Sequence, residues 1–291
     1  MATMRMGFHV SIAGGISNSV GKAKNIGCTA FQIFSRNPRG WMAKALDPTD
    51  VELFRSKLDA SGIDRDAVIM HMPYLPNLSG PEGEFYKKSI STLKGELERC
   101  AALGIPFLVI HLGSHMGKGT KAGIEQLSKA LTTARAKVDK AQGHQRVTVL
   151  LENNSGQKNS MGSNFEELRL MLDRLGSSKG YGICLDTCHL FASGNDVRSM
   201  EGVEKTIANF SNIVGIKELR LLHLNDSKGG LNSKIDRHEH IGLGQIGREG
   251  MSAFLNEKRI RKLPIIMETP IDERRGDEEN LRTVLGLIRP L

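Results

Sequence analysis

Residues 181–189 read Tyr-Gly-Ile-Cys-Leu-Asp-Thr-Cys-His, and the interpretation of the whole chain starts from them. A short apolar run, Ile183 to Leu185, ends on Asp186, and His189 follows three residues later. Burying a carboxylate at the end of an apolar strand is costly unless a partner compensates its charge. A metal ion is one such partner, because Asp and His are both ligands of zinc and similar ions. The alternative is an Asp that caps a helix, with an ordinary His beside it.

Eight apolar runs of strand length lie along the chain, and segments of helical periodicity separate them. The runs are Gly7–Val10, Ala30–Phe34, Ala67–Met72, Phe107–Leu112, Val147–Leu151, Tyr181–Leu185, Leu219–Leu224 and Leu263–Met267. The helical segments include Val51–Ser61, Glu84–Leu103, Gly123–Ala141, Phe165–Leu175, Val203–Ile213, Met251–Lys258 and Glu278–Ile288. Strands that alternate with helices pair in parallel. Eight such units in 291 residues predict an α/β protein, a single (β/α)8 TIM-barrel domain over residues 1–291.

The composition is that of a folded protein with a basic surface. Hydrophobic residues make up 39% of the chain, and 40 Lys and Arg against 32 Asp and Glu give a net charge of +8. Such an excess suits a polyanionic partner such as nucleic acid. The apolar runs are too short to span a bilayer, and no signal-type stretch precedes Gly7, so we expect a cytoplasmic protein with no membrane partner.

Four cysteines in so long a chain do not make a disulfide framework. Cys184 and Cys188 lie close enough in the sequence to act together as metal ligands. Their spacing is C-x-x-x-C rather than C-x-x-C, however, and Cys184 sits inside an apolar strand. We therefore expect both to be reduced residues that pack in the interior.

Six of the eight predicted strands end on a residue that can bind a metal ion. These residues are His71, His111, Glu152, Asp186, His223 and Glu268. In a parallel barrel the carboxyl ends of all strands meet at one face, where barrel enzymes keep their active sites. A single His at a strand end is usually structural. Three imidazoles and three carboxylates packed together without cations would instead repel one another and lose their hydration.

The loops after two of these strands supply three further candidate ligands. His189 follows the sixth strand, and Asp236-Arg-His238 follows the seventh. An Asp-x-His pair can bind one ion from a single loop, and its alternative is a polar surface loop. Catalytic zinc takes about three protein ligands, so nine candidates with one shared carboxylate fit three ions. Nitrogen and oxygen ligands favour zinc, with manganese or iron as alternatives, and closely spaced ions suit phosphodiester hydrolysis.

Four separated motifs resemble those of endonuclease IV, a family of zinc-containing DNA endonucleases that act at abasic sites. The motifs are Phe8-His-Val-Ser-x-x-Gly-Gly15, Leu185-Asp-Thr-Cys-His189, His223-Leu-Asn-Asp-Ser-Lys228 and Asp236-Arg-His-Glu-His-Ile-Gly242. The resemblance runs from Gly7 to about Glu268. It implies three zinc ions per chain, with manganese or iron as an alternative at one site. The first would be held by His71, His111 and Glu152, the second by Glu152, Asp186, His223 and Glu268, and the third by His189, Asp236 and His238.

The resemblance also implies a reaction on double-stranded DNA. Hydroxide held between the first two ions would attack the phosphorus 5′ to an abasic site, with Glu152 and Glu268 as the catalytic carboxylates. The third ion would stabilise the departing oxygen, so the products would be a 3′-hydroxyl and a 5′-deoxyribose phosphate. A monomer is expected, because the enzyme must lay one face on DNA.

By position, Arg39, Tyr74 and Leu75 resemble the side chains that this family inserts into the duplex at the lesion. Tyr74 and Leu75 could instead cap the rim of the barrel, and Arg39 could be one more surface cation. Two other histidines are not carried over as ligands. We expect His9 to support the floor of the site and His240 to orient a ligand.

Other enzyme and binding classes fit parts of this pattern. A sugar isomerase or epimerase shares the barrel and uses divalent metals. It does not need a third ion, however, and so has no need of His189 and Asp236-x-His238 as ligands. A content of one metal ion per chain would favour this class. A non-catalytic barrel would bind damaged DNA and never cut it. An amidohydrolase is disfavoured, because its His-x-His on the first strand is missing and only His9 is present.

Overall fold

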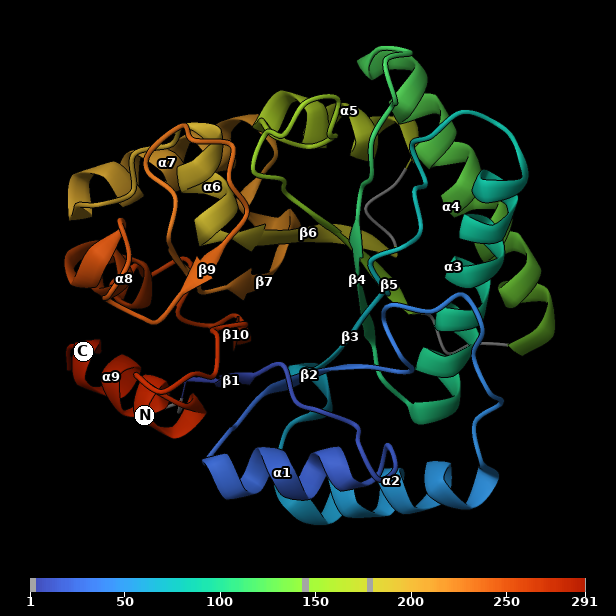
Figure 1. The fold of residues 1–291 in the computed structure, drawn as a ribbon, viewed down its shortest axis with the longest axis horizontal. Helices are drawn as coiled ribbons and strands as arrows, with labels where there is room; N and C mark the ends of the chain where they lie inside the picture. Colours follow the sequence, from blue (N-terminus) through green and yellow to red (C-terminus); the bar gives the residue numbers. More distant parts are fainter. Residues whose placement is uncertain (1–3, 143–146, 177–179, 291) are drawn as a thin grey trace.

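Eight parallel strands form a ring with helices around it in the computed structural model, which describes residues 4–142, 147–176 and 180–290 (Figure 1). The strands are β1 Met6–Phe8, β2 Phe31–Phe34, β3 Val68–His71, β4 Phe107–His111, β5 Thr148–Glu152, β6 Tyr181–Asp186, β7 Leu219–His223 and β10 Ile265–Met267. All eight predicted strands and the TIM-barrel fold are confirmed. Residues 1–3, 143–146, 177–179 and 291 of the predicted domain lie outside the described residues.

The ring closes between its first and second strands. The strand order is β1-β10-β7-β6-β5-β4-β3-β2, and each neighbouring pair is parallel. His9 and Gln32 then form a parallel bridge, and the backbone N–H of Val10 donates to the carbonyl of Gln32 at 2.7 Å. A closed parallel ring brings the carboxyl ends of all eight strands to one face, and this face carries the site described below.

Nine helices are found in the described residues. They are α1 Asn18–Ile26, α2 Pro48–Ser61, α3 Glu84–Leu103, α4 Thr120–Gln142, α5 Phe165–Arg174, α6 Thr187–Ser193, α7 Met200–Ile213, α8 Gly247–Asn256 and α9 Asp277–Leu287. The seven helical segments predicted from the sequence are confirmed, and α3 has the predicted bounds. The first turn of α2 is capped by the Asp47 carboxylate, which accepts the N–H of Thr49 at 2.9 Å. None of the described helices is long and apolar enough to cross a membrane.

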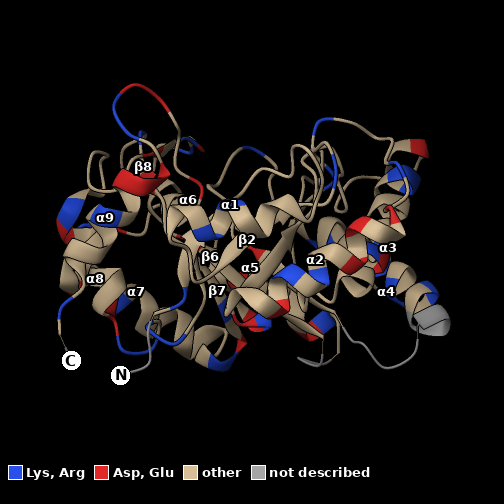
Figure 2. Cartoon of the chain, turned by 90° about the horizontal axis from the view of Figure 1, so that it is seen from below, with Lys and Arg blue, Asp and Glu red and all other residues tan. Residues whose placement is uncertain are grey.

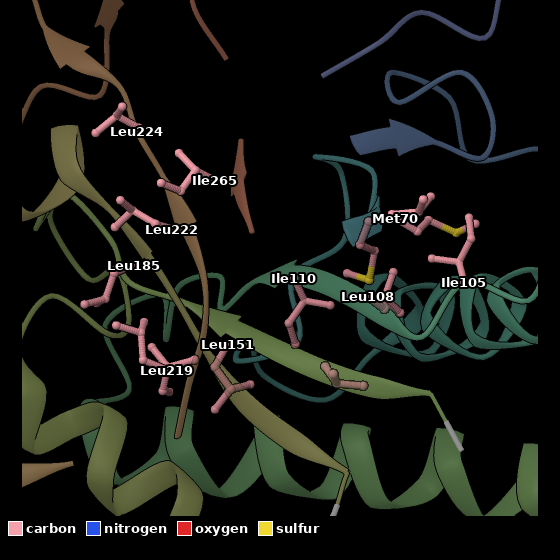
Figure 3. Packing of buried hydrophobic residues seen from close by; sticks show 14 of the residues in the cluster. Met70, Ile105, Leu108, Ile110, Leu151, Leu185, Leu219, Leu222, Leu224 and Ile265 are labelled. Carbon is pink, nitrogen blue, oxygen red and sulfur yellow. The ribbon is translucent and has the colours of Figure 1, made fainter. Parts of the chain in front are cut away.

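Two apolar layers hold the barrel together. The inner layer fills the ring and consists of Ala30, Ala67, Ile69, Val109, Leu150, Cys184, Leu221 and Ile266. The outer layer lies between strands and helices, and Figure 3 shows part of it, including Ile110, Leu151 and Leu185 from neighbouring strands. The two layers follow from the period of two in a strand, which points successive side chains to opposite faces. Polar groups at the strand ends therefore rest on a packed interior.

A short antiparallel hairpin, β8 Asp226–Ser227 and β9 His238–Glu239, lies beyond the end of β7. The carboxylate of Asp226 is fully buried and accepts five backbone N–H groups. The donors are Ser227 at 2.8 Å, Gly242 at 2.9 Å, Gly244 at 3.0 Å, Ile246 at 3.0 Å and Gly247 at 3.3 Å. The backbone N–H of Lys228 also donates to the carbonyl of Arg237 at 2.9 Å. These bonds fix the hairpin that carries His238.

Candidate metal centre

The nine candidate ligands from the sequence all meet at the carboxyl end of the barrel. They form three groups, namely His71, His111 and Glu152; then Glu152, Asp186, His223 and Glu268; and finally His189, Asp236 and His238. Within each group, one ligand atom from every residue lies within 4.8 Å of the others. Glu152 belongs to two groups, as the resemblance implies.

Glu152, the last residue of β5, presents one carboxylate oxygen to each of two groups. Its Oε2 lies 3.3 Å from Nε2 of His71 and 3.2 Å from Nε2 of His111. Its Oε1 lies 3.0 Å from Nδ1 of His223. Burial opposes ionisation of this carboxyl, but His223 and His111 hold its pKa well below its usual range. An ionised carboxylate that faces two groups of imidazoles has the geometry of a bridging ligand.

Asp186 caps a helix and also lies in the cluster of candidate ligands, so the capping interpretation is confirmed and the metal-ligand interpretation stays a prediction. Its Oδ1 accepts the backbone N–H of His189 at 2.9 Å, which caps the first turn of α6. Its Oδ2 lies 4.0 Å from Nδ1 of His223 and 3.5 Å from Nε2 of His238. The cap holds the residue in place while the second oxygen faces the other ligands.

The third group is built around Asp236, on the loop between β8 and β9. Its Oδ1 lies 3.1 Å from Nε2 of His189 and 3.7 Å from Nε2 of His238. Burial disfavours protonation of His189, but the carboxylates of Asp186 and Asp236 raise its pKa to about 10. The carboxylates around His189 therefore favour a positive charge at this ring.

The hydrogen bonds of three histidines leave lone pairs that suit metal ions. Each ring places Nδ1 against a backbone carbonyl, His71 on Met72 at 2.7 Å, His189 on Asn153 at 2.9 Å and His238 on Glu268 at 3.1 Å. A carbonyl can only accept, so Nδ1 carries the proton and Nε2 is free to bind a cation. The Nε2 atoms of His189 and His238 are buried and face carboxylate oxygens at 3.1–3.7 Å, but neither makes a hydrogen bond of good geometry among the described residues. These orphaned atoms and the mixed N and O donors fit zinc.

Two buried asparagines support the centre, and neither is among the residues predicted from the sequence. Asn153 accepts the backbone N–H of Asp186 at 2.6 Å, and its Nδ2 donates to the carbonyl of the same residue at 3.2 Å. Asn225 donates to the Asp186 carboxylate at 2.6 Å. Asn153 directly follows Glu152, and Asn225 stands two residues after His223. These positions could have indicated their role, because an amide beside a ligand at a strand end is well placed to orient that ligand.

The two cysteines near the centre behave as packing residues. Cys184 and Cys188 are free and buried, as expected. Burial raises the pKa of the Cys184 thiol to about 12 and also raises that of Cys188. Each thiol lies within 4.8 Å of candidate ligand atoms, Cys184 of Glu152 and His223 and Cys188 of Asp186 and His238, and burial favours its protonated form.

A cavity of about 330 Å³ opens at this face and is lined by several of the candidate ligands together with His9, Phe34 and Tyr74. The Tyr74 side chain is 54% exposed, and its ring centre lies 5.7 Å from that of His111. Arg39 is exposed on the loop after β2, and Leu75 is half-buried beside Tyr74. Of the three predicted wedge residues, Tyr74 lines the cavity and the other two lie outside its lining.

The two accessory histidines have different outcomes. His9 lines the cavity, and its Nδ1 lies 3.4 Å from Oε1 of Glu268, which is the supporting position expected for it. The ring of His240 instead contacts Asp272 at 2.9 Å and Asn280 at 3.0 Å. The expectation that His240 orients a ligand is therefore wrong, because its partners belong to the segment after Glu268 and to α9.

Exposed cations stand on several loops that follow the carboxyl ends of the strands. They are Arg39 after β2, Lys118 after β4, Lys158 after β5, and Lys228, Lys234 and Arg237 after β7. Figure 2 shows Lys and Arg segments, together with some Asp and Glu segments, on the loops along the upper edge of that view, and the two chain ends lie on its lower side. Part of the basic charge thus lies on loops of the face that carries the candidate ligands.

Comparison with known proteins places this geometry in a family. Residues 20–291 match the family described as xylose isomerase-like TIM barrel. A protein named probable endonuclease 4 from Cenarchaeum symbiosum is 51% identical over 98% of this chain and 99% of its own length. The crystal structure of endonuclease IV from Thermus thermophilus superposes with a TM-score of 0.84, at 36% identity over 97% of this chain and 98% of that one. A D-tagatose 3-epimerase-like protein, at 19% identity and a TM-score of 0.70, shares the fold over 98% of each chain.

Proposed function

The chain belongs to the endonuclease 4 family of DNA-repair endonucleases, which have the xylose isomerase-like TIM-barrel fold, and we propose that it hydrolyses the phosphodiester 5′ to an abasic site. The products are a 3′-hydroxyl and a 5′-deoxyribose phosphate. The observation that carries the proposal is Glu152, whose Oε2 faces the imidazoles of His71 and His111 at 3.3 and 3.2 Å and whose Oε1 faces that of His223 at 3.0 Å. A sugar epimerase has no use for the third group at Asp236.

The three groups of side chains hold three zinc ions in this proposal, with manganese or iron as an alternative at one position. Bound zinc would supply positive charge at the phosphate and lower the pKa of a water towards about 7. Glu152 and Glu268 would be the catalytic carboxylates, and Glu152 would help to hold two of the ions. Asp236, His189 and His238 would hold the third, whose charge would stabilise the departing oxygen.

The surface around the cavity binds the DNA. The exposed cations of the rim contact phosphates on both sides of the lesion, because such contacts supply most of the affinity for a duplex. Tyr74, Leu75 and Arg39 insert where the base is missing, since unstacking costs least there. The partner is therefore double-stranded DNA with abasic sites, and we expect the enzyme to act as a monomer in the cytoplasm.

The direct test uses a duplex with one tetrahydrofuran abasic analogue and a 5′ label on the damaged strand. We expect one cut on the 5′ side and a product that a polymerase extends, which reports a 3′-hydroxyl. A strong chelator abolishes the cut, and added zinc restores it. The undamaged duplex is the substrate control, and Glu201→Gln, an exposed carboxylate on α7, is the protein control.

The same preparation separates the alternatives by metal content and product. Three zinc ions per chain support the proposal. One ion per chain, an uncut duplex and interconversion of ketohexoses would identify a sugar epimerase. An abasic duplex that is bound and never cut by metal-loaded protein would identify a binding protein instead.

A further inference from the structure

Gln32 is a buried amide in the middle of an apolar strand. It lies in β2 between Phe31 and Ile33, both of which pack in the outer layer, and its own side chain points into the ring with none of its surface exposed. The Oε1 atom lies 2.9 Å from Nε2 of His223. The Nε2 atom donates to Oε1 of Glu268 at 2.7 Å and lies 3.0 Å from Nδ1 of His9.

The chemistry of these partners allows one orientation of the amide. A carboxylate only accepts hydrogen bonds, so the amide nitrogen must face Glu268, and the carbonyl oxygen must face His223. The oxygen also only accepts, so Nε2 of His223 must carry a proton. Nδ1 of His223 is then the nitrogen directed at the cluster, 3.0 Å from Oε1 of Glu152 and 3.6 Å from Oε2 of Glu268.

We propose that Gln32 is a positioning residue for the second ligand group, where one amide sets the tautomer of His223 and turns Glu268 so that Oε2 faces the ion. This role rests on the proposed metal centre. The two ligands come from β7 and β10, and Gln32 reaches both from β2, so it fixes their relative position across the ring.

The residue type follows from these contacts. A glutamate at this position would place a carboxylate oxygen about 2.7 Å from that of Glu268, and the two would repel. An asparagine is one methylene shorter and cannot span the same gap. A methionine fills a similar volume but leaves the buried Nε2 of His223 without this partner, and Oε1 of Glu268 then keeps only the longer contact to His9 at 3.4 Å.

The test compares Gln32→Met and Gln32→Glu with Ile33→Val, a control in the same strand whose side chain lies in the outer layer. Each metal-free protein is titrated with zinc, and the rate of zinc loss to a chelator is measured. In other proteins, replacing a residue that hydrogen-bonds to a metal ligand typically lowers the metal affinity 10–100-fold. We expect a loss of about this size for one ion in Gln32→Met, a larger loss in Gln32→Glu, and wild-type values in Ile33→Val.

Two further readouts distinguish positioning from general stability. The visible spectrum of cobalt-loaded protein should change in Gln32→Met and not in Ile33→Val. In NMR spectra of the zinc-loaded wild type labelled with ¹⁵N-histidine, His223 should show a proton on Nε2. This measurement uses the wild-type protein alone, so it does not depend on whether a variant folds. Zinc on Nε2 of His223, or wild-type affinity and spectrum in Gln32→Met, would overturn the positioning role alone. A wild-type protein that binds no zinc would overturn the metal centre together with this role.

Discussion

Asn225 and Asp186 are joined by a buried hydrogen bond of 2.6 Å from Nδ2 of the amide to Oδ2 of the carboxylate. The oxygen of the same amide accepts the backbone N–H of Glu268 at 2.7 Å. The hydroxyl of Thr187, next to Asp186, donates to the backbone carbonyl of Asn225 at 2.7 Å. One amide therefore sets the distance between the end of β6 and the end of β10, where two proposed ligands stand.

Replacing this amide by a carboxylate should destabilise the protein. Asn225→Asp places a second carboxylate oxygen at hydrogen-bond distance from that of Asp186, and the new side chain keeps the backbone N–H of Glu268 as a donor. We expect the free energy of unfolding of the metal-free protein to fall by about 1–3 kcal/mol in urea titrations at neutral pH. Asn212→Asp, on the exposed surface of α7, is the matched control and should stay close to wild type. Equal stability of the two variants would contradict the role of Asn225.

Loss of the shared carboxylate should abolish most activity. Glu152→Gln keeps the shape of the side chain and removes the charge that faces both imidazole groups. We expect cleavage of the abasic duplex to fall roughly 1000-fold or more, which corresponds to about 4 kcal/mol in the barrier. Zinc content, measured by mass spectrometry, should fall by at least one ion. Wild-type turnover in this variant would rule out the proposed centre, and Glu201→Gln should keep both activity and zinc.

Tyr74 should contribute more to lesion binding than to chemistry. Its ring lies beside His71 and His111 at the cavity mouth, and burial together with the carboxylates of the centre raises its pKa to about 12, so it stays neutral near pH 7. Tyr74→Ala should weaken binding of an abasic duplex by about 1–3 kcal/mol, the usual contribution of an aromatic side chain that stacks on a base. Single-turnover cleavage at saturating enzyme should change much less. An unchanged dissociation constant would refute the wedge assignment, and Leu170→Ala on α5 is the control.

The cations of the rim should determine how binding depends on salt. Lys118→Gln and Lys158→Gln each remove one exposed charge from loops beside the cavity. For each variant, we expect the steepness with which the logarithm of the DNA-binding constant falls with the logarithm of the salt concentration to decrease by about 1. The loss of affinity should be similar for damaged and undamaged duplex. Lys137→Gln, on the exposed side of α4, should leave the slope unchanged. A flat salt response of the wild type would point to a small-molecule substrate.

Acid should remove the stabilisation provided by Asp50. This side chain on α2 accepts the backbone N–H groups of Ile16 and Ser17 at 2.7 and 3.1 Å, and it thereby connects α2 to the start of α1. Burial opposes its ionisation, but the hydrogen bonds from Ser17 and Ile16 keep its pKa below the usual 3.8. A carboxyl whose pKa is lower in the folded state stabilises the protein above its unfolded pKa, and this contribution disappears as pH falls through the folded value.

The measurement compares wild type with Asp50→Asn in urea as a function of pH. Near pH 6 the variant should be less stable by roughly 1–2 kcal/mol. The difference should shrink below pH 3.8, the usual pKa of this carboxyl. A difference that is independent of pH would contradict the charge-based explanation. Asp59→Asn, on the exposed part of the same helix, should not show this pH dependence.

Strand and helix positions could be predicted where the signal is local. The strands of the ring are apolar runs with clear ends, and α3 has a long amphipathic pattern, so their positions agree with the sequence. The predicted segments did not include α1 and α6. Every residue of α6 except Ser193 is buried, so it has no polar face, and the segment before α1 is held by Asp50, more than 30 residues away.

The candidate ligands were predictable for the same reason, since each stands at the end of a strand or in a short motif. Their supporting residues were not. Gln32 contacts His223 and Glu268, which lie 191 and 236 residues further along the chain. His240 was misjudged because its closeness to His238 in the sequence suggested a shared site, whereas its ring packs on Asp272. Such contacts join residues that are far apart in the sequence and that meet only when the barrel closes, so the local sequence pattern does not predict them.

The hairpin loop is held at both ends and along its length. The five amides on Asp226 and the hydrogen bond between Lys228 and Arg237 fix its two ends. Between these ends, the backbone N–H groups of Asn232 and Lys234 donate to the carbonyls of Phe191 and Ala192 in α6, each at 3.1 Å. An inserted or deleted residue in this stretch would therefore break its alignment with α6 and displace Asp236 and His238, so a grafted peptide or a reporter dye belongs elsewhere on the surface.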